Sequence, residues 1–187
     1  AAKLYWKRFS DQRSKAIIRF TEPPHKDGVA LLLEEPRDKS ADPEMTIYLP
    51  ELRSTRRIAG TALNGSMFGT GFSYEDFAQF QRIASDHNLR HLDDQELESR
   101  ANYVLETSPT GAASEYKRIV TFIDQVWCIP VLTQFYGDAE IPMKEIVVDQ
   151  AEVRQLGNRW IPYLLNLYDR ARGGRTEIIV DKVELDP

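Results

Sequence analysis

Short runs of β-forming residues, each closed by a polar or glycine-containing turn, follow one another along most of this 187-residue chain. Residues 4–9 and 14–20 flank the polar turn at 10–13, which is typical of a β-hairpin. Since hairpins pair neighbouring strands in opposite directions, the pattern predicts a mainly β (α+β) protein built on an antiparallel sheet. Further strands are predicted at 29–34, 45–49, 52–58, 101–107, 116–124, 131–136, 143–156, 160–168 and 176–185.

Length and charge narrow the classes of protein that this chain can belong to. A length of 187 residues fits one domain, so residues 1–187 are predicted to fold as a single unit with its own core. The net charge of −5 argues against a nucleic-acid partner, because phosphate contacts need a basic surplus. No apolar run is long enough to form a membrane-spanning helix. Cys128 is the only cysteine, and its neighbours Trp127 and Ile129 predict a packed, unreactive thiol.

The segment 65–77 joins a glycine-punctuated apolar loop to the start of a helix. Gly65, Gly69 and Gly71 match neither the dinucleotide fingerprint nor the P-loop. Their apolar neighbours are Met67, Phe68 and Phe72, which would contact a phosphate poorly. The segment is interpreted either as a plain surface turn or as an apolar flap over a greasy ligand.

The helix that follows the loop is predicted to be amphipathic. Its apolar stripe and its polar side fall at helical spacing, and three aromatic rings lie on the stripe. The apolar stripe consists of Tyr74, Phe77, Phe80 and Ala84, and the opposite side of Glu75, Asp76, Gln79 and Arg82.

Residues 160–167 have apolar or aromatic side chains on both faces of the predicted strand. A strand of an antiparallel sheet normally keeps one wet face. The run therefore predicts a curved sheet whose concave side is shielded by the helix and the flap.

Three arginines lie on the strand predicted at 52–58. Alternation places Arg56 on the same face as Ile58 and sends Arg53 and Arg57 to the other face. A guanidinium on an apolar face needs a carboxylate or carbonyl partner, so Arg56 could hold a lid shut or bind a head group. The alternative is a set of solvated arginines on an edge strand.

Catalytic and metal sites find little support in the sequence. His87 and His91 lie near Asp93 and Asp94, yet the predicted end of the helix separates the two histidines and the spacing matches no zinc signature. There is no Gly-x-Ser-x-Gly elbow, and paired acids such as Asp93–Asp94 lie in polar, loop-like surroundings. We predict no catalytic residue, no metal and no cofactor, and hence a protein that is not an enzyme.

Several motifs together resemble the LolA-like family of outer-membrane lipoprotein-sorting proteins. The likeness extends from about Phe20 to Leu185 and is most specific in the central segment; Gly71 stands where the family pattern leads us to expect an acidic residue. The motifs are Tyr48-Leu49-Pro50, Arg53, Arg56-Arg57-Ile58, Ser66-Met67-Phe68-Gly69-Thr70-Gly71-Phe72-Ser73-Tyr74-Glu75-Asp76, and Gly157-Asn158-Arg159-Trp160-Ile161-Pro162.

The resemblance implies a strongly curved antiparallel sheet, an incomplete β-barrel capped by one or more short helices around an apolar cavity. It also implies a periplasmic carrier that takes lipoprotein acyl chains or another envelope lipid from an inner-membrane transporter and transfers them toward the outer membrane. Compared with the family pattern, the N-terminal part of the full-length protein is expected to be absent from this sequence. Arg56 and Arg57 are the candidates for lid or head-group contacts. The candidate lipid-binding residues are Met67, Phe68, Phe72, Tyr74, Phe77, Phe80, Trp127, Phe135, Trp160 and Leu165.

Two other functions stay open at this point. The same fold could serve as an envelope-stress sensor or transporter-accessory module that contacts a protein without shuttling cargo. A hydrolase acting on a lipid or glycan is the third reading, and it lacks a recognisable acid and base pair.

Overall fold

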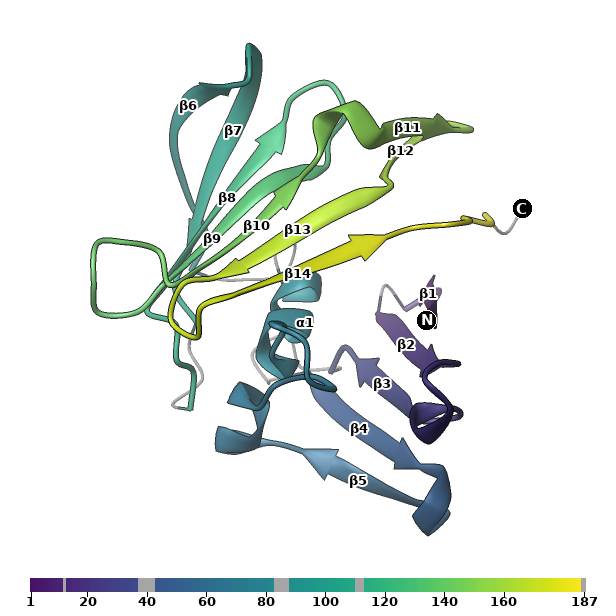
Figure 1. Ribbon diagram of the computed structural model, residues 1–187. Helices are drawn as coiled ribbons and strands as arrows, with labels where there is room; N and C mark the ends of the chain where they lie inside the picture. The colour runs from purple at the N-terminus through teal and green to yellow at the C-terminus, as the bar shows by residue number, and fades with distance from the viewer. Residues whose placement is uncertain (12, 37–42, 83–87, 110–112, 186–187) are drawn as a thin grey trace. The chain divides into compact units, whose positions relative to one another are not determined.

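The computed structural model describes residues 1–11, 13–36, 43–82, 88–109 and 113–185, without the side chains of 80–82. Antiparallel strands and a few short helices make up the chain, which confirms the predicted fold class (Figure 1). The described strands form open sheets that do not close into a barrel. The chain divides into two compact units, Ala1–Gly65 with Tyr74–His87 and Gly111–Ala113, and Ser66–Ser73 with Asn88–Thr110 and Ser114–Pro187.

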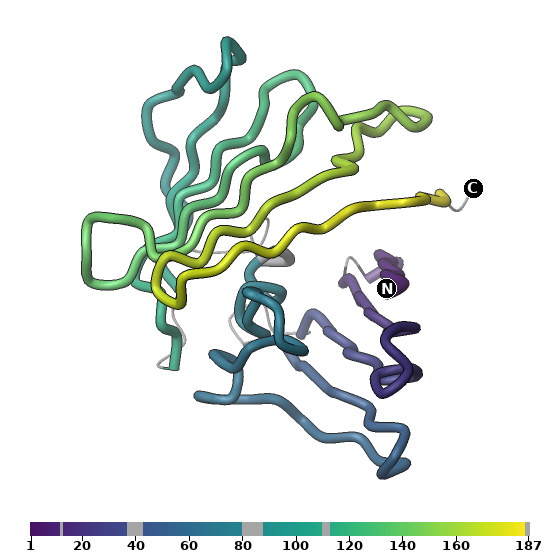
Figure 2. The backbone as a smooth tube through the Cα atoms, in the orientation of Figure 1, coloured from purple at the N-terminus to yellow at the C-terminus, as the bar shows by residue number. Residues whose placement is uncertain are grey.

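The first unit contains a five-stranded antiparallel meander, which the purple-to-blue part of the tube traces in Figure 2. Alternation buries one face of it, where Ala16, Leu31, Leu33 and Met45 are at most 3% exposed. The strands are β1 (Ala2–Arg8), β2 (Ser14–Phe20), β3 (Ala30–Glu34), β4 (Glu44–Leu49) and β5 (Ser54–Ile58), with short 3-10 turns η1 (Pro24–Lys26), η2 (Pro50–Leu52) and η3 (Gly60–Asn64).

The predicted helix is present as α1 (Tyr74–Arg82), which also belongs to the first unit. Tyr74 and Phe77 are half-buried, as expected for its apolar stripe. The side of the helix that was expected to face water is buried instead, since Glu75 and Asp76 are 5% and 0% exposed. The helix is therefore covered on both sides, and amphipathic spacing alone did not predict this.

The second unit contains a seven-stranded antiparallel sheet in the order β14-β13-β10-β9-β8-β7-β6. Its core face carries a cluster of buried side chains from four strands, from the segment before β8 and from the loop 66–73: Phe72, Tyr116, Ile119, Phe135, Ile146 and Leu167. The strands are β6 (Arg90–Leu97), β7 (Arg100–Thr107), β8 (Arg118–Asp124), β9 (Pro130–Tyr136), β10 (Lys144–Val148), β13 (Leu164–Asp169) and β14 (Gly174–Ile179).

Two long predicted strands are each divided in the structure. The run at 143–156 becomes β10, a 3-10 turn η4 (Gln150–Glu152) and β11 (Val153–Leu156), and the run at 160–168 becomes β12 (Arg159–Pro162) and β13. Strands β11 and β12 pair with each other in a separate ribbon. The side chain of Asp149 accepts a hydrogen bond from the Ala151 amide at 3.0 Å and so caps the turn that leads into this ribbon. The apolar residues at 160–167 therefore belong to two sheets, which explains why both faces looked covered.

Strand β6 and the surroundings of Cys128 differ from the prediction. Asp93 and Asp94, which were predicted to lie in loop-like surroundings, belong to strand β6. This strand is at the edge of its sheet, where polar residues are common. Cys128 is exposed rather than packed, because the chain turns between β8 and β9 and Cys128 has a φ of 55°.

Candidate functional site

The loop Ser66–Ser73 is a small hairpin that carries three of the predicted lipid-binding residues. Its ends form an isolated antiparallel bridge, and the Thr70 amide donates to the Met67 carbonyl at 3.2 Å. The two residues between them, Phe68 and Gly69, have φ angles of 56° and 80°. Positive φ at both central positions is the pattern of a type I′ turn, which favours Asn, Asp and Gly. Phe68 is thus a bulky residue in a backbone conformation that such a residue rarely adopts.

Two contacts fix this loop to the seven-stranded sheet of its unit. The Phe72 ring is 4% exposed and belongs to the core cluster. The Gly71 amide donates to the hydroxyl of Thr176 on β14 at 2.8 Å. A Cβ atom at Gly71 would lie 2.7 Å from Cδ2 of Leu167, closer than van der Waals contact allows. Glycine at this position therefore lets the loop backbone lie directly on β13, where the acidic residue expected from the family pattern would not fit without a shift.

The core cluster brings four of the predicted residues together. The Phe135 ring lies 4.9 Å from the Tyr116 ring, measured between centroids, and is 1% exposed. Phe72 belongs to the same cluster, and the half-buried side chains of Met67 and Leu165 pack against it. These residues share one apolar face of the second unit, and Met67 and Leu165 are less completely buried than Phe72 and Phe135.

The remaining apolar candidates lie elsewhere. Trp127 and Trp160 are half-buried, and their rings lie 5.7 Å apart, so the turn between β8 and β9 contacts the β11–β12 ribbon. Tyr74 and Phe77 belong to α1 in the first unit, where burial raises the pKa of the Tyr74 hydroxyl. The side chain of Phe80 lies outside the described residues.

The two candidate arginines are exposed on β5, the edge strand of the first unit. The register pairs Arg56 with Ile47 and Ile58 with Met45, so Arg56 shares the face that buries Met45. The Arg57 guanidinium lies 3.9 Å from the Glu44 carboxylate. The role of both arginines as head-group contacts stays a prediction.

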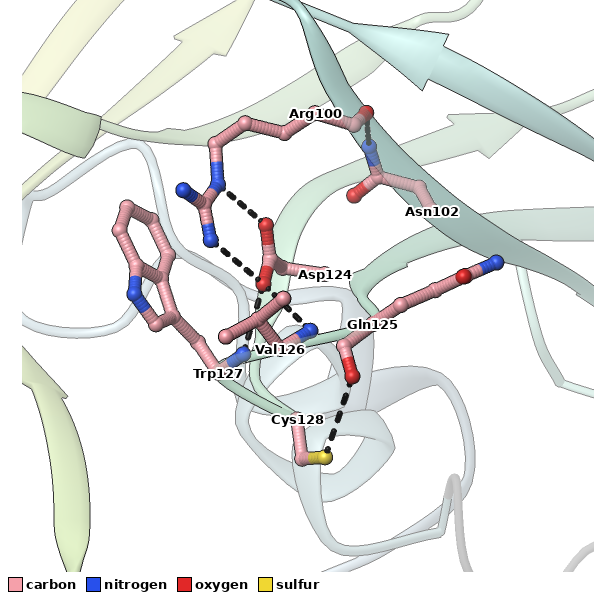
Figure 3. Close-up of polar contacts among 7 residues, drawn as sticks. All are labelled: Arg100, Asn102, Asp124, Gln125, Val126, Trp127 and Cys128. Carbon is pink, nitrogen blue, oxygen red and sulfur yellow. Dashed lines mark hydrogen bonds and ion pairs between the residues drawn. The ribbon is translucent and has the colours of Figure 1, made fainter.

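A buried ion pair that the sequence did not predict lies where β7 and β8 meet (Figure 3). Arg100 donates to the Asp124 carboxylate through Nε at 2.5 Å and through an Nη at 2.9 Å. The same carboxylate accepts the amides of Val126 at 2.9 Å and Trp127 at 2.6 Å. The Asp124 side chain is 1% exposed, and the Arg100 side chain is 30% exposed. Four donors therefore satisfy this carboxylate and fix the turn.

The charges of this pair stabilise each other. The hydrogen bond from Arg100 lowers the pKa of Asp124, and the two turn amides add to the effect, while burial opposes it. The hydrogen bond to Asp124 likewise raises the pKa of Arg100. The guanidinium carbon of Arg100 also lies 3.6 Å from the Trp127 ring centroid, in a cation–π contact. Trp127 thus contacts both Arg100 and Trp160 at one end of the sheet.

Buried polar groups elsewhere in the second unit were also missed. Lys144 is 2% exposed, and its ammonium lies 5.8 Å from the centroid of the Tyr116 ring. Asp169, its register partner on β13, is 2% exposed and accepts the Arg172 amide at 2.9 Å. Nothing in the sequence marks these positions, because each is a charged residue at the end of a strand, where exposure is the usual outcome.

The described part of the chain offers neither a cluster of metal ligands nor a membrane-spanning helix. No group of three or more His, Cys, Asp or Glu side chains there is placed to hold a metal ion. His87, one of the histidines considered above, lies outside the described residues. Within the same residues, no helix combines the length and hydrophobicity that crossing a membrane requires.

Residues 12–187 match the model of a protein family described as "Uncharacterized protein". No curated protein matches the sequence.

Three solved structures are similar to this chain in fold. A Vibrio parahaemolyticus domain described as an outer membrane lipoprotein-sorting protein superposes with a TM-score of 0.84 at 22% identity, over 97% of this chain and 75% of the other. A DUF1329 family protein from Desulfovibrio piger gives a TM-score of 0.81 at 22% identity, over 95% and 74%. A LolA superfamily protein from Nitrosomonas europaea gives 0.60 at 16% identity, over 90% and 74%. At these identities the likeness shows the fold, which is LolA-like.

Proposed function

Because the chain belongs to the family matched over residues 12–187 and has a LolA-like fold, we propose that it carries lipid in the bacterial periplasm. The cargo is the acyl chains of a lipoprotein or another envelope lipid, bound in an apolar cavity, received from an inner-membrane transporter and passed toward the outer membrane. The description of the Vibrio parahaemolyticus domain as lipoprotein-sorting supports this direction of transfer.

The proposal rests on the backbone conformation of Phe68, which has a φ of 56°. A type I′ turn forms with least strain when Asn or Gly occupies its first central position, whereas a bulky residue in a sparsely populated region costs about 1–3 kcal/mol. The turn alone therefore does not account for an aromatic ring at φ 56°. Phe68 is half-buried and follows Met67 on a loop that Phe72 fixes to the sheet, so its ring is suited to contact with a hydrocarbon chain.

The energetics of such a site need no covalent step. Removing an acyl chain from water contributes about 0.8 kcal/mol for each methylene that is buried. A chain of ordinary length can therefore be retained by apolar contact alone and released when a better site is offered. This is why we propose a binding protein rather than an enzyme.

The test combines lipid identification with a displacement assay. Lipid extracted from the purified protein is identified by mass spectrometry, and a fluorescent fatty acid is titrated and then displaced by an unlabelled one. Bound lipid and saturable displacement are expected; a protein free of lipid that gives no saturable displacement would contradict the proposal.

A matched pair of variants separates the loop from general effects. Phe68→Asn is expected to weaken probe binding by about tenfold, since it removes an apolar ring from the contact, while the fold persists because Asn suits the turn. Tyr168→Asn is the control, because this exposed ring alternates with Leu167 and so lies on the opposite face of the sheet. Equal affinities for the two variants would remove Phe68 from the site.

A further inference from the structure

Positive charge is concentrated in the hairpin of β1 and β2. The first twenty residues include six Lys or Arg and one acidic residue, Asp11, although the whole chain has a net charge of −5. Two of the six cations are neutralised locally, because Arg13 pairs with Asp11 at 2.7 Å and Lys15 pairs with Glu34. Among the described residues, the other four have no carboxylate within ion-pair distance, and these are Lys3, Lys7, Arg8 and Arg19.

The register gathers most of these cations on one face. Lys3 lies opposite Arg19, and Lys7 lies opposite Lys15, with Tyr5 and Ile17 paired between them. Opposite residues on paired strands project to the same side of the sheet. The ammonium groups of Lys7 and Lys15 each lie 5.8 Å from the ring centroid of Phe9 in the adjoining turn.

Exposed apolar side chains accompany the charges along the same strand. Strand β1 is exposed at every position, and it is the edge strand of its sheet. Tyr5 is 54% exposed on the cationic face, whereas Leu4 and Trp6 are 62% and 51% exposed on the other face. An approach along the edge of β1 would therefore bring side chains from both faces to the same surface.

From this juxtaposition we propose that the β1–β2 hairpin docks on the surface of an anionic phospholipid bilayer. The lysines and arginines contact the phosphate groups, and Leu4, Tyr5 and Trp6 enter the interfacial region, where Trp and Tyr are favoured. Each basic residue near an anionic surface adds to the attraction, which decays within a Debye length. The hairpin would hold the protein at a membrane during transfer, and this docking does not depend on a bound cargo.

A second copy of the chain fits this edge less well. Antiparallel pairing of two β1 strands centred on Tyr5 would place each Lys3 opposite the partner's Lys7, and like charges directly opposite are unfavourable. Lysines on an edge strand are also a common means of preventing edge-to-edge association. Charge complementarity therefore favours a lipid surface over another strand of the same sequence.

Co-sedimentation with lipid vesicles tests the proposal. The protein is expected to bind phosphatidylglycerol vesicles, to bind phosphatidylcholine vesicles at least about tenfold more weakly, and to be released by about 0.5 M salt. Lys3→Glu with Lys7→Glu is expected to weaken binding to the anionic vesicles by about tenfold or more. Lys117→Glu with Arg159→Glu is the control, since both residues are exposed on the second unit and the change in net charge is identical.

Two readouts make each outcome decisive. Circular dichroism and thermal unfolding check that both double variants fold, which is expected because every residue of β1 is exposed. Equal losses of vesicle binding in the two double variants would overturn the proposal, and so would wild-type protein that does not bind anionic vesicles. A dimer that light scattering detects without lipid, and that persists in Lys3→Glu with Lys7→Glu, would also overturn it. Displacement of a soluble fatty-acid probe should be unchanged in the Lys3→Glu with Lys7→Glu variant, so failure of docking and failure of cargo binding are distinguishable.

Discussion

At the scale of single residues, Asp124 has the most demanding surroundings. It is nearly inaccessible to water, and its carboxylate accepts four hydrogen bonds, two of them from Arg100. A carboxylate held in this way stabilises the fold only while it is ionised. The sequence could not show the pair, because Arg100 and Asp124 approach each other only through the register of β7 and β8.

Asp124→Asn tests this pair through the pH dependence of stability. The pKa of Asp124 is lowered in the folded state, so its contribution is complete above the unfolded value of about 4 and is lost as pH falls toward the folded value. The variant is expected to lose about 2 kcal/mol of unfolding free energy at neutral pH and to show a flatter decline in acid. Urea unfolding at several pH values measures both effects.

The exposed Asp138 provides the comparison, since Asp138→Asn changes the same chemical group in the turn after β9. Its unfolding free energy at neutral pH should remain within about 0.5 kcal/mol of the wild type. A similar loss of unfolding free energy in both variants would mean that the ion pair with Arg100 does not stabilise the fold.

At the scale of elements, the loop Ser66–Ser73 depends on one close approach. The Gly71 backbone lies against β13 and β14 at a distance that leaves no room for a methyl group beside Leu167. This fit joins the turn at Phe68 to the core cluster through Phe72. A side chain at Gly71 would therefore disturb the position of the loop and the packing of the sheet together.

Gly71→Ala is expected to lower the unfolding free energy by about 1–3 kcal/mol through this overlap and to weaken binding of the fatty-acid probe. Gly174→Ala is the matched control, because nothing lies within 4 Å of a Cβ atom at Gly174 and its φ is not in the left-handed region. Urea denaturation followed by tryptophan fluorescence measures both variants. Equal unfolding free energies of the two variants would show that the loop can shift to accommodate the methyl group without loss of stability.

Elements with a regular apolar pattern were predicted well from the sequence. The hairpin of β1 and β2 and the helix α1 lie where the alternation and the helical spacing placed them. Strand β6 was missed, because an edge strand needs no apolar face and its composition resembles that of a loop. The divisions of 143–156 and 160–168 were missed since a strand that leaves one sheet for another keeps its apolar pattern.

The candidate site was only partly predictable for the same reason. Met67, Phe72, Phe135 and Leu165 do meet at the core cluster of the second unit. Their apolar character was readable, whereas the contacts of Trp127 with Arg100 and Trp160 depend on a turn and a ribbon that no local pattern specifies. Burial of charged residues such as Lys144 arises from long-range packing, which is invisible in a window of neighbouring residues.

At the scale of the whole molecule, cargo binding and stability are linked. A ligand that binds only the folded chain adds RT ln(1 + [L]/Kd) to its unfolding free energy, which is about 2.7 kcal/mol at a hundredfold excess over Kd. A saturating fatty-acid probe is therefore expected to raise the melting temperature of the wild type. Thermal unfolding with and without the probe measures this, and an unchanged melting temperature under saturation would contradict binding to the folded state.

Cys128 offers a site for a fluorescent label that can detect lipid or membrane binding. It is the sole cysteine of the chain, and it lies exposed on the turn next to Trp127. A maleimide-linked dye can be attached there at one defined position without any substitution. Its emission would then report, in real time, when a lipid or a membrane approaches the end of the sheet where β8 meets β9.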